Sequence, residues 1–215
     1  VGKPERMKSI RQLITEDGQP KIVVLSALSG STNTLLSISE SLNSGNQTEA
    51  KVKATELRAH YDQFLTELYS TPAGLGKGQA IVEKEFNFID SLIATAPYTG
   101  KQEKEMVALG ELLSTQIFEA FLQEEGVSSA LLPALDFMVI DEDNEPVLSV
   151  IEQKLATVLA PVKGKQIYVT QGFICRNPAG EVDNLKRGGS DYTASLIGGA
   201  IQAEEVQIWT DIDGM

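Results

Sequence analysis

The sequence has few of the residues from which several common active sites are built. Cys175 is the only cysteine and His60 the only histidine among 215 residues. One cysteine cannot form a disulfide within the chain, which fits a reducing compartment, and we expect a cytoplasmic protein. One histidine argues against a Ser-His-Asp hydrolase and against a histidine-rich metal site. The surrounding residues predict an exposed helical position for His60 and a small strand residue, not a reactive thiol, for Cys175.

Positive charge and long apolar runs are also scarce. The chain has 18 Lys and Arg against 30 Asp and Glu, a formal net charge of −12, which argues against binding to nucleic acid or to an anionic membrane. No apolar run reaches the roughly 18 residues of a membrane-spanning helix, so we expect no membrane segment. Hydrophobic residues make up 42% and charged residues 22%, as in an ordinary soluble globular protein of one large or two small domains.

The most informative stretch is KRGGSDYT at 186–193, which follows a strand-like run at 166–173. Its two glycines allow the backbone to approach a ligand closely. Ser190 is predicted to cap the helix that follows, and the free N–H groups of a helix start favour anions. Arg187 can hold a carboxylate or phosphate through two parallel hydrogen bonds. Asp191 can bind an ammonium group or hold Arg187 in place. A plain glycine turn with a capped helix is the alternative interpretation.

Apolar periodicity predicts helices and strands that alternate along most of the chain. A helix is predicted for 4–15, and a nearly continuous apolar strand for 21–26. A loop of small and hydroxyl residues follows that strand, and a helix is predicted to begin near Thr34. The other predicted elements are strands at 130–134, 137–140, 166–173 and 206–215, a hairpin turn at 177–180, and helices at 146–159 and 192–203. This order predicts a three-layer αβα sandwich on a mostly parallel sheet.

Residues 44–125 differ because they contain helical patterns and no strand pattern, and we interpret them as a helical insertion into the α/β domain. The predicted helices are 48–68, 79–94 and one that begins near 101, with a Pro-Gly loop at 72–76 before the second helix. The third helix contains Gly110 followed by Glu111. A glycine within a helix costs about 1 kcal/mol relative to alanine, so we expect another group to approach closely there. A solvated glutamate on a helix surface is the alternative interpretation of Glu111.

Four motifs lie at the ends of these strand and helix patterns. They are LSALSGSTN at 25–33, GELLS at 110–114, QGF at 171–173 followed by RGGSD at 187–191, and WTDIDG at 209–214. In this order and spacing they resemble the kinase domain of aspartokinases, in the amino-acid kinase superfamily, and the resemblance covers nearly the whole chain. It implies ATP-dependent phosphorylation of the β-carboxylate of L-aspartate to 4-phospho-L-aspartate, the first step of lysine, threonine and methionine biosynthesis.

The resemblance also implies roles for five residues around the reacting groups. Ser26 matches a serine near the transferred phosphoryl group, and Asp191 matches an aspartate that organises the catalytic centre. Thr32 matches a hydroxyl residue that contacts aspartate. Glu111 matches a glutamate that holds the substrate ammonium, and Arg187 an arginine that binds a substrate carboxylate. Phosphoryl transfer depends mainly on positioning and on neutralising charge, and these residue types supply both.

The nucleotide side of the site is implied in the same way. Gly188, Gly189 and Ser190 match the family's glycine-rich loop, and Thr210 and Asp211 match its nucleotide-binding pair. ATP and Mg²⁺ are the implied cosubstrate and metal, because the ion bridges and neutralises the phosphates; its protein ligands stay unassigned. A homodimer is the family expectation for the full-length protein.

One departure from the family pattern concerns the start of the chain. The family begins with a strand that ends in a Lys-Phe-Gly-Gly-Thr-Ser motif, and Val1 and Gly2 resemble the residues just after it. Lys3 is predicted to open a helix and does not replace the motif's lysine. We therefore expect residues 1–215 to form a kinase domain that is incomplete at both ends, lacks the regulatory ACT domains and is inactive by itself. The allosteric effector, lysine or threonine, would bind in those ACT domains.

Three alternatives remain open from the sequence. Glutamate 5-kinase, acetylglutamate kinase and uridylate kinase share the fold, although the Glu111 motif and the long helical segment favour aspartokinase. The chain can instead be a module that binds a nucleotide or an amino acid without turnover. The parent protein can also be fused to homoserine dehydrogenase, which these residues do not decide because they contain no dinucleotide-binding G-x-G-x-x-G motif.

Overall fold

The centre of the fold is a parallel sheet of three strands, seen in a computed structural model that describes residues 2–185 and 188–209. The strands are β1 (Lys21–Leu25), β2 (Ser129–Leu132) and β3 (Ile167–Gln171), and β3 lies between the other two. Both outer strands pair with β3 from Ile167 onward. Because the strands are parallel and in this register, their carboxyl ends meet at one edge of the sheet.

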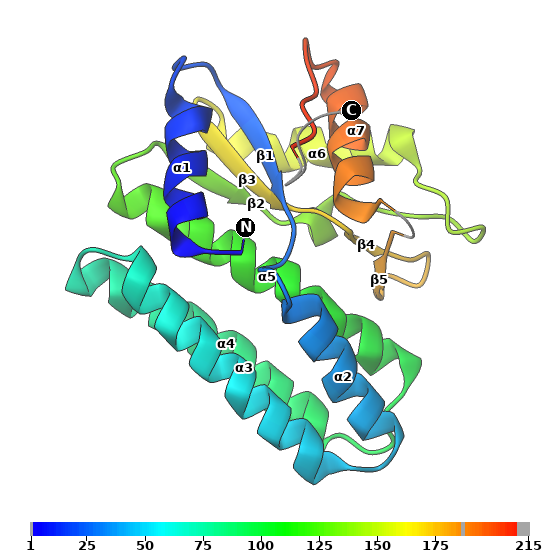
Figure 1. Cartoon of the computed structure of the whole chain (residues 1–215). Helices are drawn as coiled ribbons and strands as arrows, with labels where there is room; N and C mark the ends of the chain where they lie inside the picture. The colour runs from blue at the N-terminus through cyan, green and yellow to red at the C-terminus, as the bar shows by residue number, and fades with distance from the viewer. Residues whose placement is uncertain (1, 186–187, 210–215) are drawn as a thin grey trace.

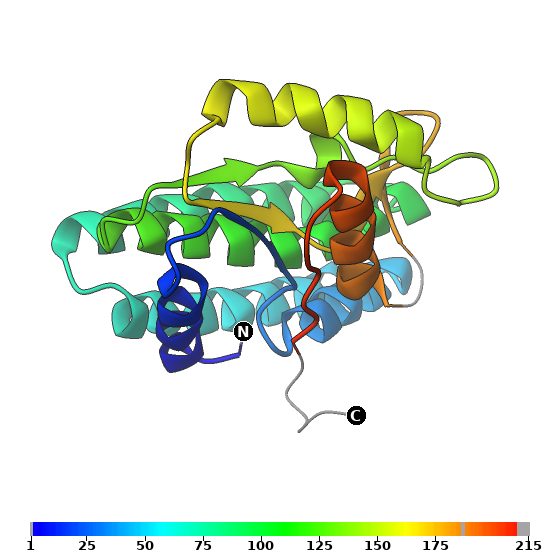
Figure 2. The same cartoon turned by 90° about the horizontal axis from the view of Figure 1, so that it is seen from above.

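Side chains that alternate along the strands bind the sheet to a helical layer on each face. In β3, Ile167 and Val169 join one buried cluster, which includes side chains of α5 (Gly100–Glu124). Tyr168 joins a second cluster, with side chains of α6 (Leu148–Leu159) and α7 (Gly189–Ile201). The neighbouring strand β1 alternates in the same way, with Val23 toward the first cluster and Val24 toward the second. From above, α6 runs along one side of the sheet (Figure 2). The predicted three-layer αβα sandwich is therefore confirmed.

The first half of the chain is mostly helical. Its helices are α1 (Pro4–Thr15), α2 (Ser31–Asn43), α3 (Gln47–Leu68), α4 (Pro72–Ala94) and α5 (Gly100–Glu124). The long helices α3, α4 and α5 and the shorter α2 lie together on one side of the sheet (Figure 1). Among the described residues, no helix combines the length and the apolar character that crossing a membrane requires.

The predicted loop at 72–76 is wrong, because those residues form the first turns of α4. Thr71 caps the helix by accepting a hydrogen bond from the Gly74 N–H at 3.0 Å, and Pro72 occupies the first turn, where proline is favoured. Two glycines serve packing, because a Cβ at Gly74 would lie 2.9 Å and one at Gly78 2.5 Å from the ring of Tyr69, whereas a Cβ at Gly76 would meet nothing within 4 Å. Helix α2 also begins earlier than predicted, at Ser31, because Gly30 ends the loop with a φ of 85°.

The second half of the chain completes the sandwich. Its elements are the short 3₁₀ helices η1 (Ala134–Asp136) and η2 (Ala160–Val162), helix α6 (Leu148–Leu159), strands β4 (Ile174–Arg176) and β5 (Val182–Asn184), and helix α7 (Gly189–Ile201). Strands β4 and β5 are antiparallel, which confirms the hairpin predicted around 177–180.

Two predictions for this half are wrong, and a third is wrong over residues 206–209. Residues 137–140 are not a strand, because their pairing is limited to single bridges from Val139 and Ile140. Helix α7 begins at Gly189, not near 192, and its cap is Gly188 with a φ of 71°, so Ser190 lies inside the first turn. Residues 206–209 are irregular and exposed, and the rest of the strand predicted for 206–215 lies outside the described residues.

Candidate active site

The loops that follow β1 and β3 meet the start of α7 at the carboxyl edge of the sheet. The hydroxyl of Ser26, just after β1, donates a hydrogen bond to the Ser190 hydroxyl at 2.8 Å. A Cβ at Gly172, just after β3, would lie 2.7 Å from the Cα of Ser190, and one at Gly189 would lie 3.1 Å from the Cα of Phe173. Glycine is therefore needed on both sides for the β3 loop and the first turn of α7 to touch.

The backbone at Phe173 is held in an uncommon conformation. Its φ is 68°, and the Ile174 N–H donates to the carbonyl of Gly172 at 2.7 Å, which closes a three-residue turn. The Thr193 hydroxyl fixes this turn to α7, because it accepts from the Phe173 N–H at 3.1 Å and donates to the Gly189 carbonyl at 2.7 Å. Such conformations cost on the order of 1–3 kcal/mol and gather at functional sites.

Glu111 places a buried carboxylate at the same edge. The residue is only 4% exposed, so the alternative of a solvated surface glutamate is wrong. Its Oε1 accepts a hydrogen bond from the Ala27 N–H at 3.3 Å, while its Oε2 is buried with no hydrogen-bond partner among the described residues. Burial raises the pKa of Glu111 to about 7, and the Ala27 N–H opposes that rise. A buried carboxylate with one free oxygen is suited to hold a cation.

The neighbours of Glu111 on α5 fasten this helix to the loop after β1. A Cβ at Gly110 would lie 2.8 Å from the Cβ of Ala27, so the predicted close approach at this glycine is confirmed. One turn further along, the Ser114 hydroxyl donates to the Ser26 carbonyl at 2.8 Å. The position of the Glu111 carboxylate relative to Ser26 is therefore fixed from both sides.

Two helix starts contribute N–H groups near this edge. Helix α2 begins at Ser31 and brings the half-buried Thr32 beside α5, where its hydroxyl oxygen lies 3.8 Å from a Cβ built at Gly110. Helix α7 begins at Gly189 and carries the exposed Asp191 in its first turn. The first N–H groups of a helix have no partner within it and attract anions.

The structure thus brings together most of the residues predicted from the motifs. Those within the described residues are Ser26, Thr32, Glu111, Gly188, Gly189, Ser190 and Asp191. Arg187, Thr210 and Asp211 lie outside the described residues.

Two contributions were missed from the sequence. The Ala27 N–H carries no sequence signal, because a main-chain donor is common to nearly every residue type. Ser114 lies three positions after Glu111, on the same side of a helix, and that spacing is a signal that could have been used.

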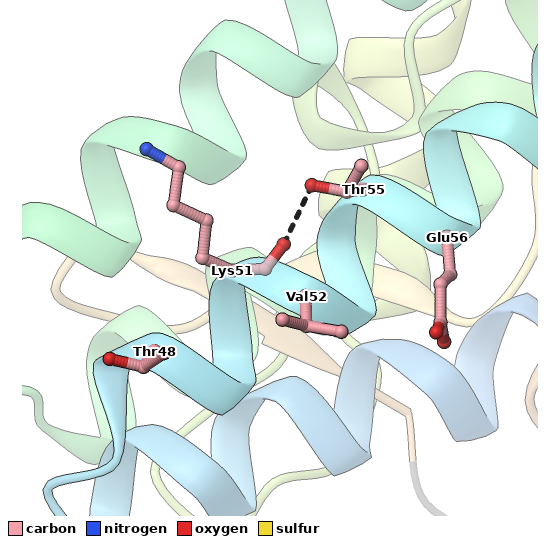
Figure 3. A pocket seen from close by; sticks show the side chains of 5 residues that line it. All are labelled: Thr48, Lys51, Val52, Thr55 and Glu56. Carbon is pink, nitrogen blue, oxygen red and sulfur yellow. Dashed lines mark hydrogen bonds between the residues drawn. The ribbon is translucent and has the colours of Figure 1, made fainter.

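Two surface hollows lie away from this edge. One, of about 350 Å³, follows the outer side of α3 (Figure 3) and is lined by Thr48, Lys51, Val52, Thr55 and Glu56. A second, of about 590 Å³, lies between α3 and α4 and is lined by Arg58, Asp62, Gln79, Ala80 and Glu83. Both are wide open to solvent, and neither includes a residue of the carboxyl edge.

Comparison with known proteins adds three kinds of likeness. The family model described as the amino acid kinase family matches residues 1–215. Lysine-sensitive aspartokinase 3 of Escherichia coli K12 is 30% identical over 215 residues, which cover 98% of this chain and 46% of that protein. Aspartokinase 1, chloroplastic, of Arabidopsis thaliana is 30% identical over 230 residues, with coverage of 100% and 39%. The chain thus spans less than half the length of these relatives.

Solved structures show the same relationship. E. coli aspartokinase III in complex with aspartate and ADP superposes with a TM-score of 0.82 at 28% identity, covering 99% of this chain and 47% of that one. The complex of the same enzyme with lysine and aspartate superposes with a TM-score of 0.84, also at 28% identity, covering 100% and 48%.

Proposed function

The chain belongs to the amino acid kinase family, and on that premise we propose that the protein is an aspartate kinase. In the proposed reaction, an oxygen of the β-carboxylate of L-aspartate attacks the γ-phosphorus of ATP. The bond between that phosphorus and the oxygen bridging to the β-phosphate breaks, and ADP leaves with the electron pair. The product is 4-phospho-L-aspartate. Support comes from the relatives named aspartokinase and from the aspartate and ADP bound in the E. coli structure.

The single observation that carries the proposal is the Glu111 carboxylate. Its Oε2 is buried and unpartnered among the described residues, and it lies at the edge where Ser26 and Ser190 meet. An unpaired carboxylate in such a place is costly unless a ligand completes it. The ammonium group of an amino acid supplies both the opposite charge and the missing donors. We propose that Glu111 binds the substrate ammonium and that Thr32 and Arg187 bind its other polar groups.

The anionic side of the reaction has its own set of groups. The start of α7 offers N–H groups that have no partner within the helix, and the glycines at 188 and 189 allow a phosphate to approach the backbone. We propose that Ser26 contacts the transferred phosphoryl group and that Asp191 organises the centre. Gly188, Gly189 and Ser190 would cradle the nucleotide phosphates together with Thr210 and Asp211.

Magnesium is proposed to enter with ATP. The described residues contain no group of three or more His, Cys, Asp or Glu suited to a metal. That composition fits an ATP-bound Mg²⁺, which takes most of its ligands from phosphates and water and needs only one or two protein carboxylates. Asp191 is an exposed carboxylate at this edge and meets that need. When bound, the ion neutralises phosphate charge.

The wider organisation of the protein follows from the family resemblance. We propose that residues 1–215 belong to one catalytic domain, in which 44–125 are a helical insertion. The shared packing of α5 with the sheet and with α4 supports a single domain. We also propose a cytoplasmic homodimer. Light scattering of the purified full-length protein tests the oligomeric state.

Trapping the product tests the proposed activity. The full-length protein is incubated with ATP, Mg²⁺ and hydroxylamine, and aspartate, glutamate, acetylglutamate or UMP is offered in turn. Hydroxylamine converts an acyl phosphate into a stable hydroxamate. We expect a hydroxamate with aspartate alone. A hydroxamate with glutamate or acetylglutamate in its place would assign the protein to another branch of the family. Phosphorylated UMP is UDP, which is not an acyl phosphate and forms no hydroxamate, so turnover of UMP is read from the release of ADP. ATP binding with neither hydroxamate nor ADP release would favour a module without turnover.

A further inference from the structure

A buried pair of hydroxyl groups joins α3 to the first turn of α2. The Tyr61 hydroxyl donates a hydrogen bond to the Ser31 hydroxyl at 3.0 Å. Tyr61 is 0% and Ser31 1% exposed, so water does not replace this bond when it is lost. The Tyr61 ring packs edge-on against Phe86, with ring centroids 5.9 Å apart. The ring therefore packs in the core, whereas the hydroxyl bonds to the start of α2.

Ser31, which accepts the hydrogen bond from Tyr61, adjoins the candidate active site. Ser31 is the first residue of α2, and Thr32, the next residue, lies beside α5. On the side of α2 that faces α5, the absence of a side chain at Gly110 lets α2 and the loop before it approach α5. A Cβ at Gly110 would lie 3.5 Å from Leu35 and 3.8 Å from Thr32. The first turn of α2 is thus held between two helices, by the Tyr61 hydroxyl on α3 and by close packing on α5.

The same hydroxyl lies within electrostatic reach of Glu111. Burial is the main reason that the pKa of Tyr61 is raised; the bond to Ser31 opposes the rise and the Glu111 carboxylate adds to it. Tyr61 therefore stays protonated and remains a hydrogen-bond donor. Tyr61, Ser31 and Glu111 bring three polar groups from three helices into one buried region.

We propose that Tyr61 is a positioning residue for the amino-acid substrate. Its hydroxyl fixes Ser31, and through Ser31 it sets Thr32 and the first N–H groups of α2 relative to the Glu111 carboxylate. This inference rests on the proposed aspartate kinase activity and deepens it. It gives the helical segment 44–125 a part in substrate binding, although Tyr61 itself touches no substrate.

The chain offers a matched pair of substitutions for the test. Tyr61→Phe removes the hydroxyl that reaches Ser31 at the start of α2. Tyr98→Phe removes a hydroxyl that lies 2.7 Å from the hydroxyl of Ser39, more than two turns further along the same helix. Both changes remove one oxygen and one bond to a serine of α2. They differ in whether that serine adjoins the site.

Steady-state kinetics of the full-length protein should separate the two variants. We expect Tyr61→Phe to raise the KM for aspartate roughly three- to tenfold, as the loss of one neutral hydrogen bond allows, and to leave the KM for ATP unchanged. Tyr98→Phe should change neither. Because Ser31 and Tyr61 act through one bond, Ser31→Ala added to Tyr61→Phe should cause no further rise in the KM for aspartate.

Several results would overturn the positioning role. They are an unchanged KM for aspartate in Tyr61→Phe, an equal rise in Tyr98→Phe, an equal rise in the KM for ATP, and additive rises from the two changes at Tyr61 and Ser31. A fall in melting temperature without a change in KM would reduce Tyr61 to a core residue. If the wild-type protein forms no hydroxamate from aspartate, the proposed function itself fails, which is a separate outcome from an active wild type whose Tyr61 variant is unchanged.

Discussion

Replacing Glu111 by glutamine should stabilise the folded protein relative to the wild type, and this gain should grow as the pH rises. Burial raises the pKa of Glu111 from 4.5 to about 7 in the folded chain. Between these values the folded state binds more protons than the unfolded state, so the free energy of unfolding falls as pH increases. A pKa difference of this size corresponds to about 3 kcal/mol in full. Glutamine is neutral throughout and keeps an oxygen that can accept from the Ala27 N–H.

Urea unfolding followed by circular dichroism at pH 5, 6, 7 and 8 measures this effect. Other titrating groups are common to both proteins, so we expect the variant to gain about 2–3 kcal/mol over the wild type between pH 5 and pH 8. Glu56→Gln, which changes an exposed glutamate on α3, is the control and should show no such trend. A pH-independent difference between wild type and Glu111→Gln would refute the argument that Glu111 carries an uncompensated buried charge.

The same variant links stability to function. Glutamine has no charge with which to hold an ammonium group, so the more stable variant should lose affinity for aspartate. In the wild type, ionised Glu111 is the form that binds, and aspartate affinity should therefore rise as the pH increases through about 7.

Three further predictions concern other parts of the site and its supports. Arg187→Ala should raise the KM for aspartate roughly ten- to a hundredfold and leave the KM for ATP nearly unchanged, because the variant loses a charged hydrogen bond to the amino acid. Equal rises in the two KM values would show that Arg187 does not belong to the amino-acid site. Lys104→Met should lower the free energy of unfolding by about 2–3 kcal/mol, because the side chain of its ion-pair partner, Asp183, is only 9% exposed. Lys101→Met is the control and should lower it by under about 1 kcal/mol. Equal losses in urea unfolding would contradict this prediction. Gly172→Ala should lower both melting temperature and kcat, because a Cβ would lie 2.7 Å from the α7 backbone, and a stable, active variant would show that the loops are not packed as described.

Elements with strong local signals could be predicted from the sequence. Helix α1 has the predicted bounds Pro4–Thr15, because proline starts it and an apolar face follows. Strand β1 was predicted from a nearly continuous apolar run, which is typical of parallel strands that are buried on both faces, and β3 from the strand-like run at 166–173. In each case the evidence lies within the segment itself.

Features that depend on distant partners could not be predicted in the same way. Glycines at 74 and 76 are typical of a loop, and only the packing of Gly74 against Tyr69 and Glu124 explains why this stretch lies in a helix. Residues 137–140 have strand-like composition but only isolated bridges as pairing. Gly110 did signal a close approach. The burial of Glu111, however, depends on Ala27, which is 84 positions away.

The most direct test of the central claim follows an oxygen atom from substrate to product. L-Aspartate labelled with ¹⁸O in its β-carboxylate is given to the full-length protein with ATP, Mg²⁺ and hydroxylamine. Hydroxylamine attacks the carbonyl carbon of the acyl phosphate, so the phosphate that is released keeps the former carboxylate oxygen. Mass spectrometry should find one ¹⁸O in each phosphate formed together with hydroxamate. Phosphate without ¹⁸O would show that the β-carboxylate is not the acceptor and would contradict the account.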